Sequence, residues 1–101
     1  LDRKILKIKT TSDAFFKNNR EFYDFVYIDG DHTAYGVIKD AVNAFECLHT
    51  GGIIAFDDYD WRGGTGPADR PRMAIDAFLE IYRGKVEVLL KGYQCWIRKI
   101  G

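Results

Sequence analysis

Two apolar segments that each end in aspartates restrict most strongly what this 101-residue chain can fold into. The first covers residues 25–28 and is followed by Asp29, and the second covers residues 53–56 and is followed by Asp57 and Asp58. Both are short, uninterrupted runs of aliphatic and aromatic residues, which is typical of a strand that is buried on both faces of a sheet. We therefore predict two buried strands whose carboxyl ends carry acidic side chains.

The segment between these strands has the period of an amphipathic helix. Its apolar residues recur three or four positions apart and form one stripe, with Gly51 as the residue that ends the helix. The stripe consists of Val37, Ala41, Ala44, Phe45 and Leu48. A strand, a helix and a strand at this spacing form a βαβ unit, so we expect parallel strands joined by a right-handed crossover.

Shorter patterns on both sides of this unit complete a predicted α/β fold. They are a strand over residues 5–8, a helix that begins near residues 10–13, a glycine-rich loop over residues 59–69, a helix from about residue 71 to Gly84, and an antiparallel hairpin of strands over residues 86–90 and 93–97. The sequence contains no repeat and no linker, so residues 1–101 are expected to form a single domain.

The charge balance limits the classes of partner. Fifteen Lys and Arg residues match fifteen Asp and Glu residues, so the chain lacks the basic character of a nucleic-acid or membrane-surface protein. No apolar run approaches the roughly 18 to 20 residues that span a bilayer. Cys47 and Cys95 are isolated, which favours a reduced, cytoplasmic protein. We expect the function to depend on a local site, and the family resemblance described below implies a small-molecule substrate.

The aspartates at the strand ends are the main candidates for such a site. Ligands of open α/β sheets bind beyond the carboxyl ends of the strands, and neighbouring strands lie about 4.8 Å apart. Asp29 can therefore approach Asp57 and Asp58. Three clustered carboxylates favour a bound cation, and oxygen ligands favour Mg²⁺, Ca²⁺ or Mn²⁺ over zinc. The alternative is that these acids only form turns and cap helices.

The residues near these strand ends have two interpretations each. His32 is either a general base in the same site or an exposed residue at a helix start. Tyr59 and Trp61 either line a substrate pocket or pack the loop against the sheet. The glycines within residues 63–66 suit a mobile lid better than a phosphate-binding loop, because the lysine that ends such a loop is missing.

Two blocks of sequence carry a resemblance to a known family. The string YDFVYIDGDH at residues 23–32, followed by GGIIAFDDY at residues 51–59, resembles the class I S-adenosylmethionine-dependent methyltransferases. It is most similar to the metal-dependent small-molecule O-methyltransferases, and residues 11–16 resemble the segment after their third strand. The family's glycine-rich loop and ribose-binding acid have no counterpart here. The resemblance therefore implies the carboxy-terminal half of a Rossmann-like methyltransferase sheet.

The resemblance also implies roles for individual residues. It implies that Asp29, Asp57 and Asp58 hold a divalent cation, with Mg²⁺ as the expected ion, which binds and acidifies a substrate hydroxyl. It makes His32 a candidate catalytic base or substrate contact. The implied cofactor is S-adenosylmethionine, with contacts expected from Thr11, Ser12, Asp13 and Asp29.

The missing half of the family's sheet leads to a prediction about strand order. In the family, the third strand, which residues 1–9 resemble, is separated from the fourth by the first two strands. Without those two, the strand over residues 25–28 exposes an apolar edge. We therefore predict either a rearranged sheet, in which the opening strand pairs with this edge, or a homodimer through it.

Three functions are consistent with the sequence. The first is metal-assisted O-methyl transfer to a small-molecule hydroxyl by a protein whose chemistry needs a fuller chain. The second is a non-enzymatic, methyltransferase-like module that binds a partner or dimerises. The third is metal-dependent phosphoryl transfer or hydrolysis, which ranks last because no evident nucleophile follows a strand.

Overall fold

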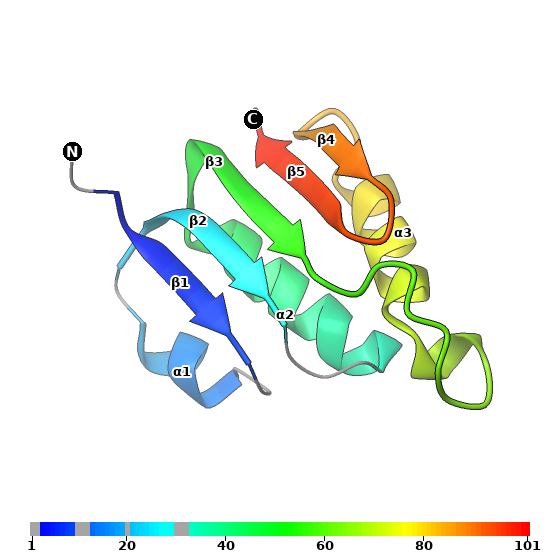
Figure 1. Cartoon of the computed structure of the whole chain (residues 1–101). Helices are drawn as coiled ribbons and strands as arrows, with labels where there is room; N and C mark the ends of the chain where they lie inside the picture. Colours follow the sequence, from blue (N-terminus) through cyan, green and yellow to red (C-terminus); the bar gives the residue numbers. More distant parts are fainter. Residues whose placement is uncertain (1–2, 10–12, 20, 30–32) are drawn as a thin grey trace.

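Five strands form one sheet in the order β1-β2-β3-β5-β4 (Figure 1). The computed structural model describes residues 3–9, 13–19, 21–29 and 33–101. Its elements are β1 (Ile5–Ile8), α1 (Asp13–Asn18), β2 (Tyr23–Ile28), α2 (Ala34–Glu46), β3 (Leu48–Phe56), the 3₁₀ turn η1 (Pro67–Asp69), α3 (Pro71–Ile81), β4 (Val86–Lys91) and β5 (Cys95–Lys99). The predicted α/β class is confirmed.

The central unit of β2, α2 and β3 is parallel, as predicted. Ile28 at the end of β2 lies opposite Phe56 at the end of β3. α2 begins after Thr33, whose side-chain oxygen accepts a hydrogen bond from the backbone N–H of Gly36 at 3.2 Å. This bond satisfies one of the donors that the first helical turn leaves free. The buried apolar stripe of α2 includes Val37, Ala41, Ala44 and Phe45.

α2 ends earlier than the sequence pattern predicts. The prediction extended the helix through Leu48 to Gly51, but α2 stops at Glu46 and Leu48 is the first residue of β3. Leu48 is 1% exposed, and a buried leucine fits a helical stripe and a strand equally well. Gly51 lies within β3 with a φ of +89°, a conformation that glycine adopts without strain.

β1 covers the edge of β2 that the sequence predicted to be exposed. The two strands are parallel, with Ile8 opposite Ile28. Of the two predicted outcomes, the structure therefore has the rearranged sheet, and β2 has no free edge for the predicted homodimer. β1 is now outermost, and the exposed Lys4, Lys7 and Lys9 on and beside it disfavour pairing with a further strand.

The last strand of the chain lies inside the sheet. β4 and β5 form the predicted antiparallel hairpin, and β5, red in Figure 1, lies between the green β3 and the orange β4. β5 is antiparallel to β3, so Cys95 at its start lies opposite Phe56 at the end of β3. The turn before β5 is therefore next to the carboxyl ends of the parallel strands.

One face of the sheet is covered by helices. α2 and α3 lie on this face (Figure 1), and Phe16 of α1 packs against the same core. The largest fully buried apolar side chains are Phe56, Phe78, Leu48, Ile54, Ile75, Ile97 and Val26. Phe25 and Tyr27 on the other face are half-buried. The prediction that β2 is buried on both faces is therefore wrong, since the described helices all pack on one side.

Both cysteines are free and buried. Burial raises the pKa of the Cys95 thiol to about 11, so both side chains behave as parts of the core. Within the described ranges, no helix combines the length and the apolar character needed to cross a membrane.

Candidate functional site

Three carboxylates meet where the parallel strands end. Asp29 follows β2, and Asp57 and Asp58 follow β3. One carboxylate oxygen of each residue lies within 4.8 Å of the others, and all three residues are half-buried. The structure thus brings together the three residues that the strand ends predicted to be neighbours, and their role as metal ligands stays a prediction.

Asp57 is held by two donors that bind the same carboxylate oxygen. The hydroxyl of Tyr27 donates to Asp57 Oδ1 at 2.5 Å, and Nε2 of Gln94 donates to it at 2.7 Å. The hydrogen bond from Tyr27 is the main cause that lowers the pKa of Asp57. Partial burial opposes this effect, and the bond from Gln94 adds to it. Asp57 is therefore ionised at neutral pH.

The pKa of Asp29 is shifted in the opposite direction to that of Asp57. Burial is the main cause that raises the pKa of Asp29, and a hydrogen bond with Asp57 and the charges of Asp57 and Asp58 raise it further. The pKa values of these two neighbouring carboxylates therefore move in opposite directions, and Asp29 takes up a proton before Asp57 as the pH falls. The negative charges of Asp57 and Asp58 act on Asp29.

Two residues of the turn before β5 belong to this cluster and were not assigned to it from the sequence. Gln94 contacts Asp57 as described, and the hydroxyl of Tyr93 donates to Asp58 Oδ1 at 3.1 Å. Neither residue belongs to a local motif. Only the position of β5 beside β3 identifies them, and that position depends on contacts between distant parts of the chain.

The two aromatic residues predicted to line a substrate pocket differ in their surroundings. Tyr59 is 3% exposed, and its hydroxyl donates to Asp76 Oδ1 of α3 at 2.7 Å. Burial and this bond raise the pKa of Tyr59 to about 12. Tyr59 thus packs the loop against α3, and its contact with substrate stays a prediction. Trp61 is half-buried, and its ring leaves no room for a side chain at Gly63. The contact of Trp61 with substrate stays a prediction.

The glycine-rich loop between β3 and α3 is hydrogen-bonded to the residues just before α3. Oδ2 of Asp69 accepts hydrogen bonds from the backbone N–H and the hydroxyl of Thr65, at 2.9 and 2.6 Å. Nε of Arg70 donates to the carbonyl oxygen of Gly63 at 3.1 Å. These bonds join the loop to the start of α3, and its predicted role as a mobile lid stays a prediction.

Several residues that the sequence assigned to the site have no described side chain. Thr11, Ser12 and His32 lie outside the described residues. Asp13 is the first residue of α1. The cofactor contacts and the role of His32 therefore stay predictions from the family resemblance.

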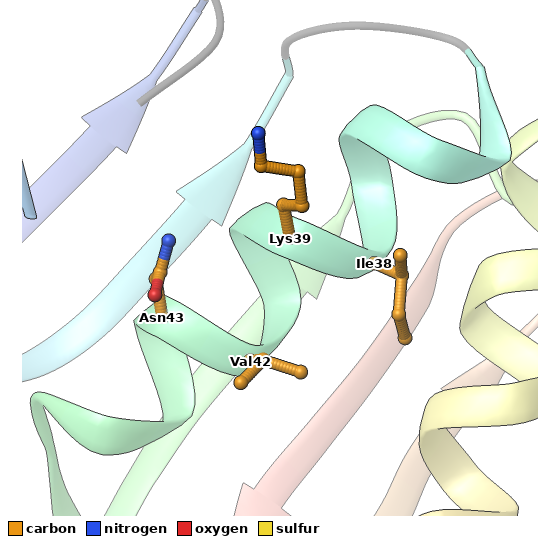
Figure 2. Close-up of a pocket in the computed structure, with 4 residues that line it drawn as sticks. All are labelled: Ile38, Lys39, Val42 and Asn43. Carbon is orange, nitrogen blue, oxygen red and sulfur yellow. The ribbon is translucent and has the colours of Figure 1, made fainter. Parts of the chain in front are cut away.

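Among the hollows lined by described residues, the two that α2 lines lie apart from the three carboxylates. One, of about 300 Å³, is lined by Ile38, Lys39, Val42 and Asn43 (Figure 2). All four belong to α2, so these residues provide a single wall. The other, of about 450 Å³, is lined by Phe16, Asn19, Glu21, Phe22, Asn43, Glu46 and Cys47. Neither hollow includes the acidic strand ends, which remain the candidate site.

The fold is similar to that of a solved methyltransferase structure. Forty chains of solved structures match significantly. One of them is the MycE methyltransferase from the mycinamycin biosynthetic pathway in complex with Mg and SAH, with a TM-score of 0.56 and 19% sequence identity. The match covers 77% of this chain and 25% of the MycE chain, so this chain spans about a quarter of that protein. The fold is that of a class I methyltransferase, present in part.

A family model identifies the chain more closely. The model described as "Methyltransferase domain" matches residues 1–59, which is more than half of the 101 residues. The matched segment contains Asp29, Asp57 and Asp58. The chain belongs to this methyltransferase domain family. A comparison with curated proteins found no significant match.

Proposed function

We propose that this chain is the carboxy-terminal half of an S-adenosylmethionine-dependent O-methyltransferase domain, in which a divalent cation binds the hydroxyl of a small-molecule substrate. The observation that carries the proposal is the cluster of Asp29, Asp57 and Asp58, with oxygens within 4.8 Å of one another. Membership of the methyltransferase domain family supports the methyl-transfer chemistry. MycE, described as a methyltransferase in complex with Mg and SAH, shares the fold and supports these two ligands.

The residues of the cluster fit a hard divalent cation. Carboxylate oxygens suit Mg²⁺ or Mn²⁺, which keep other positions for water or a substrate oxygen. Besides burial, the negative charges of Asp57 and Asp58 raise the pKa of Asp29, which supports the proposal that a positive charge stabilises the cluster. When bound, such a cation supplies Lewis-acid chemistry that lowers the pKa of a coordinated hydroxyl.

The contribution of the chain's own residues is mainly orientation. Tyr27 and Gln94 fix Asp57 at one oxygen, so the carboxylate keeps one direction relative to a bound substrate. S-adenosylmethionine carries an activated methyl group, so alignment of the acceptor oxygen supplies much of the rate. We keep His32 as the proposed base and Trp61 as a proposed substrate contact. The proposed cofactor contacts are Thr11, Ser12, Asp13 and Asp29.

Two proposals concern the setting in which the chain acts. The sequence has no counterpart of the family's glycine-rich loop, so we propose that methyl transfer requires residues beyond these 101. We also propose a reducing, cytoplasmic location, which the free cysteines Cys47 and Cys95 support.

Calorimetric titration with MnCl₂ tests the metal proposal. The wild type is expected to bind a single Mn²⁺ ion, and Asp57→Asn to lose this binding because it removes a charged ligand. Glu80→Gln is the matched control, since it also removes one negative charge, at an exposed position of α3 where Glu80 pairs with Arg83. Absence of Mn²⁺ binding by the wild type at millimolar concentration contradicts the proposal.

A further inference from the structure

The turn before β5 carries a chain of hydrogen bonds that ends on Asp57. Nε1 of Trp96 donates to Oε1 of Gln94 at 3.1 Å, and Nε2 of Gln94 donates to Asp57 Oδ1 at 2.7 Å. The hydroxyl of Tyr27 reaches the same oxygen and lies 3.5 Å from Nε2 of Gln94. Side chains from β2 and from the turn therefore meet at one carboxylate oxygen, and Trp96 of β5 contacts the one from the turn.

Trp96 decides which way the amide of Gln94 points. An indole N–H is a donor only, so the amide atom that faces it must be the oxygen. The amide nitrogen then faces Asp57, and an ionised carboxylate only accepts hydrogen bonds. The direction in which Gln94 donates is thus set by the chemistry of the groups on both sides.

Trp96 is itself fixed by the sheet. Its ring packs edge-on against the ring of Phe25, with centroids 5.4 Å apart. Trp96 lies opposite Ala55 in register, and Ala55 lies opposite Tyr27. These three residues form a row across three strands, in which the small Ala55 leaves space for the longer side chains on either side.

We propose that Gln94 is a positioning residue for the metal site, and that Trp96 fixes Gln94. With Oδ1 of Asp57 occupied by two donors, the carboxylate cannot rotate freely, and its other oxygen is presented to a divalent cation. This inference rests on the proposed metal site. Tyr93 is a different case, because it is 55% exposed and water competes for its bond to Asp58.

The Mn²⁺ affinity of the 101-residue chain tests this inference. Gln94→Met keeps the length of the side chain and removes its amide, and we expect a Kd about 10-fold weaker, at the low end of what such supporting residues contribute. Trp96→Phe keeps a ring against Phe25 and removes the N–H, so we expect a smaller loss. The double variant is expected to bind no more weakly than Gln94→Met alone, because Trp96 acts through Gln94.

Leu89→Met on β4 is the matched control, because it places methionine on the same hairpin at a partly exposed position. Circular dichroism at the titration temperature establishes that each variant is folded. A merely structural role of Gln94 lowers thermal stability and leaves the Kd of the folded protein unchanged. Equal Kd values for the wild type and Gln94→Met overturn the inference and leave the proposed metal site standing. A wild type that binds no Mn²⁺ overturns both.

Discussion

Repulsion among the clustered carboxylates is expected to make the metal-free protein less stable than a variant that lacks one of them. At the 4.8 Å limit of the cluster, two unit charges repel by about 0.9 kcal/mol in water and about 3.5 kcal/mol at an effective dielectric constant of about 20. Besides burial, the charges of Asp57 and Asp58 raise the pKa of Asp29, so Asp29 is the residue on which the repulsion acts. Because these residues are half-buried, solvent screens them, and we expect Asp58→Asn to raise the free energy of unfolding by about 1 kcal/mol.

The sign of this effect is expected to reverse when metal is bound. An ion present at 100 times its Kd stabilises the folded wild type by about 2.7 kcal/mol, and Asp58→Asn weakens that binding. In the absence of metal, acid is expected to reduce the difference in the free energy of unfolding between Asp58→Asn and the wild type. Because the pKa of Asp29 is raised in the folded protein, folding favours its protonated form. This contribution to stability is present below the ordinary pKa of an aspartate and is lost as the pH rises through the raised pKa of Asp29. The repulsion that Asp58→Asn relieves is therefore largest at neutral pH.

Urea denaturation followed by circular dichroism measures these differences, with EDTA at neutral and acid pH and with saturating MnCl₂ at neutral pH. Glu80→Gln again controls for the loss of one negative charge. The reasoning is refuted if Asp58→Asn lowers the free energy of unfolding in EDTA at neutral pH. It is also refuted if EDTA and MnCl₂ give the same difference between Asp58→Asn and the wild type.

Three further predictions concern the fold. Cys95, with a thiol pKa raised to about 11 by burial, is expected to resist a thiol reagent at neutral pH and to react once urea unfolds the chain; rapid reaction of the native thiol contradicts this. Thr33→Ala removes the cap of α2 and should cost about 1 kcal/mol in urea denaturation, whereas Thr33→Ser should be close to neutral. Phe78→Ala opens a cavity at a fully buried position of α3 and should cost about 3 to 5 kcal/mol, and a cost no larger than that of the exposed Met73→Ala would argue against the described core.

The parallel unit and its acidic ends were predictable because their signals are local. A run of four apolar residues followed by Asp29, a helical stripe, and a second run followed by Asp57 and Asp58 can each be read without tertiary information. The connection rules then place both strand ends at one edge of the sheet. The same local reading misplaced the end of α2, because Leu48 is buried in either element.

The contribution of the last strand was not predictable in this way. The sequence indicates a hairpin, but nothing local states that β5 rather than β4 pairs with β3. That choice depends on packing between residues about 40 positions apart, such as Ala55 and Trp96. From the sequence alone, Gln94 is therefore predicted to be an ordinary turn residue. The packing of Tyr59 was not predictable from the sequence either, since its partner Asp76 lies 17 positions later, in α3.

Because β5 is inserted between β3 and β4, the site is complete only after the hairpin that follows the aspartates has been synthesised. All three aspartates lie before residue 59, within the segment that the family model matches, yet Gln94, one of the two donors that hold Asp57, lies 37 positions after it. A product that stopped at Lys91 would keep every proposed ligand and would leave one side of β3 without its neighbour. Premature termination would thus yield a polypeptide that contains the three aspartates but lacks Gln94 and the strand beside β3.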